Sequence, residues 1–237
     1  MGGLLDAGAV ARGPGGAYAG PIMPTEHPAH PNLYVFDHPL MQHKMGQLRD
    51  ADTGFRAFRA LMSQVAGLMV YEVTRSFPSV EREIRTPMQM TTVRAIEARI
   101  TVVPILRAGL GMAEGVLEIM PEARVGHLGL IRDETTLLPA RYLSKLPSDL
   151  AAGPVVLIDP MLATGGSASS AVGMLRAAGA RNLSMICLVA APEGVTKMHE
   201  EHPDVRIYAA ALDERLDENG YIRPGLGDAG DRLFGTG

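Results

Sequence analysis

Apolar residues recur every three or four positions between residues 53 and 73. They are Phe55, Phe58, Met62, Val65, Met69 and Val73. This spacing places their side chains along one face of an α-helix. We therefore predict a long amphipathic helix here, with Thr53 as its N-cap because a hydroxyl oxygen can accept a hydrogen bond from a free N–H of the first turn.

Residues 80–96 follow a looser alternation, in which Val80, Ile84, Met88 and Met90 stand among arginine, glutamate and threonine. Such alternation is typical of strands with one exposed face. We predict a strand pair that forms a β-arm, which would suit contact between two copies of the chain.

Beyond residue 98, short apolar runs alternate with stretches of helical character. The runs predict strands at 100–103, 125–131, 155–159, 183–190 and 205–211, and the stretches between them predict helices at 109–120, 167–178 and 192–201. Alternating strands and helices indicate an α/β fold with a parallel sheet flanked by helices. The first of these strands is expected to end at Pro104, which has no N–H to donate to a neighbouring strand.

Residues 1–31 are rich in glycine, alanine and proline and carry no apolar periodicity. We expect a flexible N-terminal tail over this range and a single domain over residues 32–237, because the tail has no apolar face with which to offset the entropy of ordering.

Composition narrows the function classes. With 46% hydrophobic and 20% charged residues, the chain can build a full hydrophobic core. Its net charge of −4 gives no sign of the basic surface that binding to a nucleic acid requires. The one cysteine, Cys187, lies in an apolar run over 185–191, which predicts core packing rather than a disulfide and is too short to cross a membrane. We expect a cytoplasmic protein that acts on small molecules.

The strongest motif is VVLIDPMLATGGSASSAV at residues 155–172, where an apolar strand ends on Asp159 and a turn of small residues leads into a helix. Residues 164–167 present backbone N–H groups at a helix start, which favours a phosphate. No GK[ST] follows, so this is not a nucleoside-triphosphate loop. An ordinary strand-to-helix turn with Ser167 as N-cap is the simpler alternative, but it leaves Asp159 unexplained.

An acid after four apolar residues, followed by Thr-Gly-Gly-Ser, resembles the loop that binds 5-phospho-α-D-ribose 1-diphosphate (PRPP) in type I phosphoribosyltransferases. Three further stretches narrow the resemblance to the uracil phosphoribosyltransferase family: ITVVPILRAGLGM at 100–112, LVAAPEG at 188–194 and GYIRPGLGDAGDRLFGT at 220–236. The resemblance runs from about residue 38 to the C-terminus. It implies a type I phosphoribosyltransferase fold with a β-arm and a C-terminal hood that binds the base.

The resemblance also implies pyrimidine salvage, in which the phosphoribosyl group of PRPP is transferred to N1 of uracil with Mg²⁺ as cofactor, giving uridine monophosphate (UMP) and diphosphate. The catalytic residues it implies are Asp159 for the ribose hydroxyls and Arg107 and Arg132 for the diphosphate, although by position alone Arg107 is equally well explained as a solvated loop residue. The full set implied for PRPP is Arg107, Arg132, Asp159, Pro160, Met161, Leu162, Ala163, Thr164, Gly165, Gly166, Ser167 and Asp228.

For uracil, the resemblance implies Ile222, Gly227, Asp228 and Ala229, with contacts made mainly by the backbone. The resemblance also implies Asp228 as a candidate ligand of Mg²⁺, which is expected to bind mainly through the diphosphate. Arg132 stands at the base of a flexible catalytic loop whose sequence departs from the usual family form. The resemblance further implies a homodimer or higher homo-oligomer and leaves activation by a nucleotide such as GTP open.

Two alternative functions are a nicotinamide-dependent enzyme and a regulatory RNA-binding protein. The segment GLGDAG at 225–230 matches a dinucleotide fingerprint, but it follows Pro224 rather than a strand and leaves too few residues for a βαβ unit. A regulatory RNA-binding protein is the second hypothesis, since attenuator proteins of pyrimidine operons share this fold. The net charge of −4 gives no sign of the basic surface that such a protein needs.

Overall fold

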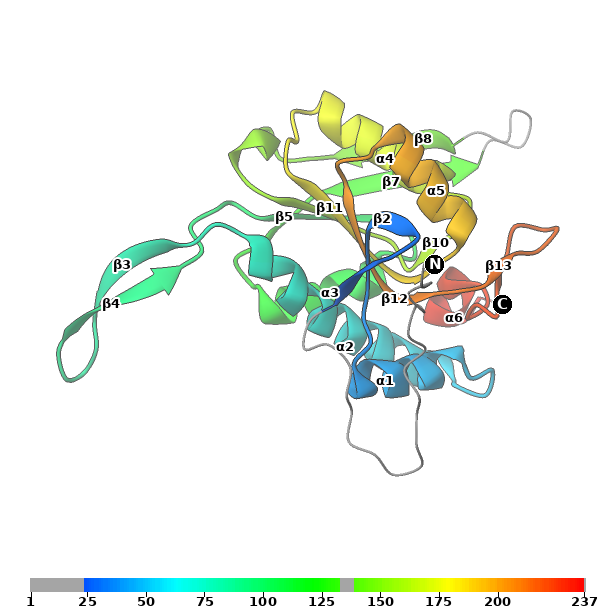
Figure 1. Cartoon of the computed structure of the whole chain (residues 1–237), viewed down its shortest axis with the longest axis horizontal. Coiled ribbons are helices and arrows are strands. Elements are labelled where there is room, and N and C mark those ends of the chain that lie inside the picture. Colours follow the sequence, from blue (N-terminus) through cyan, green and yellow to red (C-terminus); the bar gives the residue numbers. More distant parts are fainter. Residues whose placement is uncertain (1–23, 133–138, 237) are drawn as a thin grey trace, which may run out of the picture.

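The computed structural model describes residues 24–132 and 139–236 (Figure 1). A mixed sheet runs through the middle in the order β1-β2-β12-β11-β9-β5-β7-β8, with β6 paired to β5 and β10 to β11. Its strands are β1 (Thr25–His27), β2 (His30–Val35), β5 (Thr101–Leu106), β6 (Arg124–Val125), β7 (His127–Arg132), β8 (Pro139–Lys145), β9 (Val155–Ile158), β10 (Met161–Leu162), β11 (Leu183–Ala190) and β12 (Arg206–Leu212).

Within this sheet, the neighbouring strands in the order β2-β12-β11-β9-β5-β7 are parallel, whereas β1 and β8 at its edges are antiparallel to their neighbours. Every residue of β9 and β11 is buried, as expected where helices cover both faces of a parallel sheet. The predicted α/β fold with a parallel sheet flanked by helices is confirmed.

Two helical layers cover the sheet. One contains α1 (Pro39–Arg49), α2 (Phe55–Val73), α3 (Leu110–Ile119) and α6 (Ala229–Phe234), and the other contains α4 (Gly166–Ala177) and α5 (Pro192–Glu201). In Figure 1, α1 and α2 lie below the sheet and α4 and α5 above it. Short 3₁₀ turns, η1 (Thr74–Ser76) and η2 (Leu150–Ala152), complete the helical elements.

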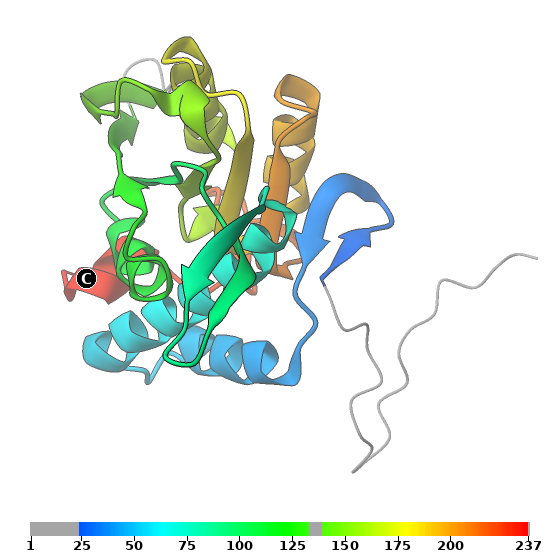
Figure 2. The same cartoon turned by 90° about the vertical axis from the view of Figure 1, so that its left-hand side faces the viewer.

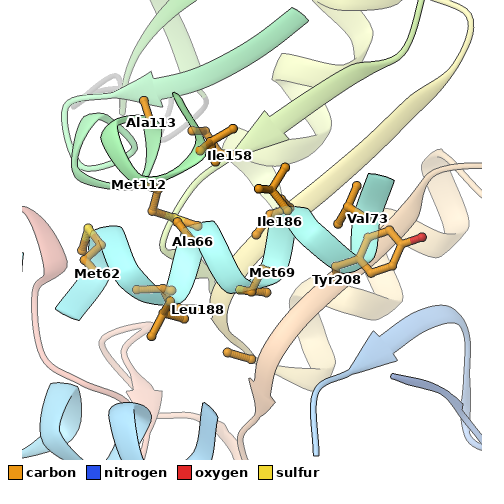
Figure 3. Packing of buried hydrophobic residues seen from close by; sticks show 14 of the residues in the cluster. Met62, Ala66, Met69, Val73, Met112, Ala113, Ile158, Ile186, Leu188 and Tyr208 are labelled. Carbon is orange, nitrogen blue, oxygen red and sulfur yellow. The ribbon is translucent and has the colours of Figure 1, made fainter. Parts of the chain in front are cut away.

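Helix α2 is the predicted amphipathic helix, and its apolar face forms the core beneath the sheet. Figure 3 shows Met62, Ala66 and Met69 among side chains of the sheet and α3. Helix α3 approaches so closely that a Cβ at Gly115 would lie 1.8 Å from the carbonyl oxygen of Ser63. The contact therefore requires glycine at this position.

The helix begins one residue later than predicted. Its N-cap is Gly54 rather than Thr53, because the Thr53 hydroxyl instead donates a hydrogen bond of 2.7 Å to the carbonyl oxygen of Gln47. That bond links the residue to the end of α1.

The prediction that the first parallel strand ends at Pro104 is wrong, since β5 continues to Leu106. Pro104 pairs with Ile158 of β9 on one side. On the other side, pairing with β6 stops at Val102 and pairing with β7 starts only at Ile105. The missing N–H of Pro104 thus falls within an interruption of the ladder.

The predicted tail over residues 1–31 is also wrong in its last part. Residues 25–27 and 30–35 form β1 and β2 at the sheet edge. The ring of Tyr34 stacks on that of Tyr208 at 5.2 Å, and the side-chain amide of Asn32 donates to the carbonyl oxygen of Pro203. Residues 1–23 lie outside the described part of the chain.

The predicted β-arm is confirmed. Strands β3 (Val80–Arg85) and β4 (Met90–Ala95) pair in antiparallel register and project from the body (Figure 1). In Figure 2 the arm is seen from its own side, in front of the sheet. Within residues 24–132 and 139–236, no helix is long and apolar enough to span a membrane.

Candidate active site

The loop that follows β9 lies at the carboxyl edge of the sheet, where ligands bind in open α/β folds. The Asp159 N–H donates to the carbonyl oxygen of Ile186, and the next residues form β10. Helix α4 then starts at Gly166, so the strand, turn and helix order predicted from the sequence is confirmed.

Gly165 is the N-cap of α4, so the position of the N-cap at Ser167, given in the simpler alternative, is wrong. Gly165 adopts a φ of 78°, a left-handed conformation that favours glycine. The first turn of α5 packs closely against the same loop: a Cβ at Gly194 would lie 2.3 Å from the carbonyl oxygen of Ala163. The glycine in LVAAPEG therefore allows close packing behind the loop, a role that the sequence alone did not reveal.

The carboxyl of Asp159 stands in an environment that disfavours its charge. Burial raises its pKa to about 7, against the smaller opposing effect of a hydrogen bond from the Met161 N–H. The residue nevertheless keeps part of its surface accessible. Cys187 is fully buried with a free thiol, so its predicted core packing is confirmed. Burial and the nearby Asp159 also raise the pKa of this thiol.

A cavity of about 250 Å³ lies between this loop and the C-terminal segment. From the loop after β9, Met161 and Ala163 line the cavity, and Ala108 contributes from the segment after β5. The other lining residues come from the C-terminal segment: Gly220, Tyr221, Ile222, Gly227, Asp228, Ala229 and Gly230. The structure thus brings all four residues expected to contact uracil to the same cavity as part of the expected PRPP loop.

The C-terminal segment forms the expected hood from β13 (Arg215–Leu216), β14 (Ile222–Arg223) and α6. Asp228 is the N-cap of α6, and its Oδ1 accepts a hydrogen bond of 2.9 Å from the N–H of Asp231. It therefore has a structural role that the sequence did not predict, in addition to its place in the cavity wall.

Arg107 follows β5 at the same sheet edge and is exposed. Its guanidinium carbon lies 5.8 Å from the ring centroid of Phe234 in α6, within the range of a cation–π contact. The peptide bond between Leu106 and Arg107 is cis. Arg107 thus stands beside the hood.

Arg132 is the last residue of β7, the strand next to β5 in the sheet. Its backbone therefore ends at the same edge as Arg107. The catalytic loop expected after Arg132 falls on residues 133–138, which lie outside the described part of the chain.

Comparison with known proteins identifies the family. The family model described as uracil phosphoribosyltransferase matches residues 35–236. The chain belongs to the uracil phosphoribosyltransferase family. Uracil phosphoribosyltransferase from Listeria innocua serovar 6a is 57% identical over 206 residues, covering 86% of this chain and 99% of the relative. The enzyme of that name from Exiguobacterium sibiricum is 57% identical over 205 residues, covering 86% and 98%.

Solved structures share the fold. The AQ2163 protein from Aquifex aeolicus superposes with a TM-score of 0.82 at 38% identity, covering 86% of this chain and 98% of that one. Adenine phosphoribosyltransferase from Trypanosoma brucei has a TM-score of 0.56 at 11% identity, covering 84% and 90%, and so shares the fold. This uracil phosphoribosyltransferase family member is an enzyme of the phosphoribosyl-transferring type.

The structure adds residues that motif analysis missed. Ala108, Gly220, Tyr221 and Gly230 line the cavity and fall inside the resembling stretches, so the motifs pointed to their segments but not to them. A partly buried ion pair between Arg49 and Asp213 lies behind the hood, and no motif pointed to it.

Proposed function

We propose that this site transfers the phosphoribosyl group of PRPP to N1 of uracil and releases diphosphate, forming UMP. The observation that carries the proposal is the shared cavity: a phosphate-binding type of loop and a hood rich in backbone groups form its walls, and Arg107 follows the adjacent strand. The two substrates would therefore meet across this cavity.

Charge is the main chemical problem of this reaction. As the bond between ribose C1 and the diphosphate oxygen breaks, the ribose becomes cation-like and the diphosphate gains negative charge, so both must be stabilised. Arg107 would bind diphosphate oxygens through paired hydrogen bonds from its fixed guanidinium. We assign Arg132 the same role, on the strand next to that of Arg107.

The loop after β9 would hold the rest of PRPP. The N–H groups of residues 164–167 lie at the start of the 12-residue helix α4, where the helix dipole favours the 5-phosphate. The Asp159 carboxylate would accept hydrogen bonds from the ribose hydroxyls. Holding both ends of the sugar orients C1 toward the base, which lowers the entropic part of the barrier.

The hood would select the base through its backbone. Uracil presents two carbonyl acceptors and an N3–H donor, whereas cytosine replaces one acceptor with an amino group and the N3–H with an acceptor. Ile222 and Gly227 line the cavity, and their peptide groups would offer fixed partners. A mismatch would leave buried polar groups unpaired, at about 1 to 3 kcal/mol each.

The residues present fit Mg²⁺ bound mainly through the substrate. Across residues 24–132 and 139–236, no group of three or more metal-ligating side chains forms a protein cage. Mg²⁺ commonly binds one or two carboxylates together with phosphate oxygens and waters. Asp228 in the cavity wall is our candidate ligand, and the ion would supply positive charge to the departing diphosphate.

The β-arm supports a homodimer. One of its faces carries Val80 and Ile84, which are 41% and 36% exposed in the single chain, opposite Ala95 and Thr91 of the other strand. Exposed apolar side chains on a projecting hairpin fit contact with a second copy. The buried free thiol of Cys187 supports a reducing, cytoplasmic compartment.

A product assay tests the proposed activity. The full chain is incubated with PRPP, Mg²⁺ and uracil, and UMP and diphosphate are separated by chromatography. Equal amounts of the two products are expected, with none when any component is omitted. Absence of UMP from a folded sample would overturn the proposal. Adding GTP to the same assay tests nucleotide activation.

A further inference from the structure

A partly buried ion pair, between Arg49 (24% exposed) and the buried Asp213, lies directly behind the base-binding hood. Arg49, at the end of α1, donates two hydrogen bonds of 2.8 and 2.5 Å to the carboxylate of Asp213, which follows β12. The Asp213 side chain is only 3% exposed. Burying the Asp213 carboxylate costs free energy, which its hydrogen bonds with Arg49 and with the Gly225 N–H offset, so these contacts fix the position of Asp213.

The pair holds one residue of the hood from both sides. Asp213 accepts a hydrogen bond of 2.9 Å from the Gly225 N–H, and Arg49 donates one of 2.6 Å to the Gly225 carbonyl oxygen. Gly225 has a φ of 66°, and a Cβ there would lie 2.2 Å from the carbonyl oxygen of Ile222. The backbone turn between Ile222 and Gly227 is thus fixed at its middle.

A second arginine fixes the next peptide. Arg232 in α6 donates 2.7 Å to the carbonyl oxygen of Leu226 and 2.6 Å to that of Leu48, and its guanidinium lies 4.4 Å from the ring centroid of Phe58. Consecutive carbonyls of the hood, those of Gly225 and Leu226, are therefore each turned toward an arginine.

This arrangement determines where the Gly227 N–H points. The peptide bond between Leu226 and Gly227 is trans, so its C=O and N–H point in opposite directions. With the carbonyl directed at Arg232, the N–H points away from it, and Gly227 lines the cavity. Among the described residues no acceptor takes this N–H, which leaves it for a ligand.

We propose that Arg49, Asp213 and Arg232 are positioning residues that aim the Gly227 N–H at the O4 carbonyl of uracil and so set the preference for uracil over cytosine. Cytosine would place its amino donor against the same N–H. The inference rests on the proposed function, and it assigns selectivity to charged side chains that do not touch the base.

The test compares Asp213→Asn and Arg49→Lys with the wild type. Asn at position 213 keeps the shape but loses the charge, and Lys at position 49 keeps the charge but cannot bind the carboxylate and the Gly225 carbonyl in the same fork geometry. The matched control is Arg176→Lys, which alters an exposed ion pair with Asp204. For each protein, kcat and KM are measured for uracil, cytosine and PRPP.

We expect Asp213→Asn to raise the KM for uracil about tenfold and to lower the uracil-to-cytosine ratio of kcat/KM by a similar factor, with the KM for PRPP within about twofold of wild type. Arg49→Lys should show a smaller change of the same kind, and the control none. An equal fall in every parameter, with the selectivity ratio unchanged, would mean a merely structural role and would overturn the inference.

Hydrogen exchange provides a readout that does not depend on turnover. Amides of residues 225–229 should exchange faster in Asp213→Asn than in wild type, while those of β9 and β11 stay protected. If the wild type makes no UMP, the proposed function fails, yet unchanged exchange in the hood would separately refute the positioning role. If Asp213→Asn does not fold, Arg49→Lys carries both measurements.

Discussion

The ionised carboxylate of Asp159 is expected to lower the free energy of unfolding while supporting catalysis. Asp159→Asn should therefore make the protein more stable and less active. Burial raises the pKa of this carboxyl from its ordinary value of 3.8 to about 7. At about 1.36 kcal/mol per pH unit, that difference corresponds to about 4 kcal/mol by which the ionised form destabilises the fold. Because Asp159 keeps part of its surface accessible, about 2 to 4 kcal/mol is the better expectation.

The pH dependence follows from the sign of this change. A carboxyl with a raised pKa binds its proton more tightly in the folded state, so the cost is absent below about pH 4, grows as the pH rises, and is complete above about pH 7. Asn carries no charge at any of these pH values. The stabilisation by Asp159→Asn should therefore be larger at about pH 8 than at about pH 5, by about 2 kcal/mol.

Urea unfolding at the two pH values measures this difference, and the product assay measures the activity. The variant should keep binding a 5-phosphate ligand but lose about 90% or more of its turnover, because an uncharged amide interacts less strongly with the ribose hydroxyls. In the wild type, kcat/KM for PRPP should fall as the pH drops below about 7. Equal stabilisation at both pH values, or near wild-type turnover at saturating substrates, would refute the reasoning.

Three further changes test other parts of the site. Gly227→Val should abolish UMP formation, because Gly227 has a φ of 79° and lines the cavity, whereas Ile222→Val should keep most of the activity. Similar kcat/KM values for the two variants would count against a base site built from the backbone. Deleting residues 2–23 should leave kcat unchanged, while extending the deletion through β1 should lower the melting temperature. Ile84→Asp should shift the protein to a monomer in sedimentation experiments, whereas Thr92→Asp, on the opposite face of the arm, should not. A wild type that sediments as a monomer would rule out the proposed dimer.

The parallel sheet could be predicted because its strands are buried on both faces and therefore appear as unbroken apolar runs, as over residues 183–190. The turn after Asp159 could be predicted from its run of small residues between a strand and a helix, whereas the close approach of α5 at Gly194 depends on the fold. That the hood and the loop after β9 contribute to one site, by contrast, was implied by the family resemblance and not by any spacing in the chain.

Other features depend on partners that are distant in the sequence. Pro104 lies inside a strand because the neighbouring strands leave a gap at its position, which local sequence cannot reveal. Strand β2 is ordered through pairing with β12, far along the chain. Arg49 and Asp213 look like ordinary surface charges in the sequence, and only the fold shows that they pair behind the hood.

The ratio of kcat/KM for uracil to that for cytosine tests the central claim most directly, because it reports on the base, the PRPP loop and the hood together. It would be measured in the wild-type full chain with saturating PRPP and Mg²⁺. We predict a preference for uracil of about a hundredfold or more, from two mismatched hydrogen bonds. Comparable values for the two bases would contradict a cavity whose backbone selects uracil.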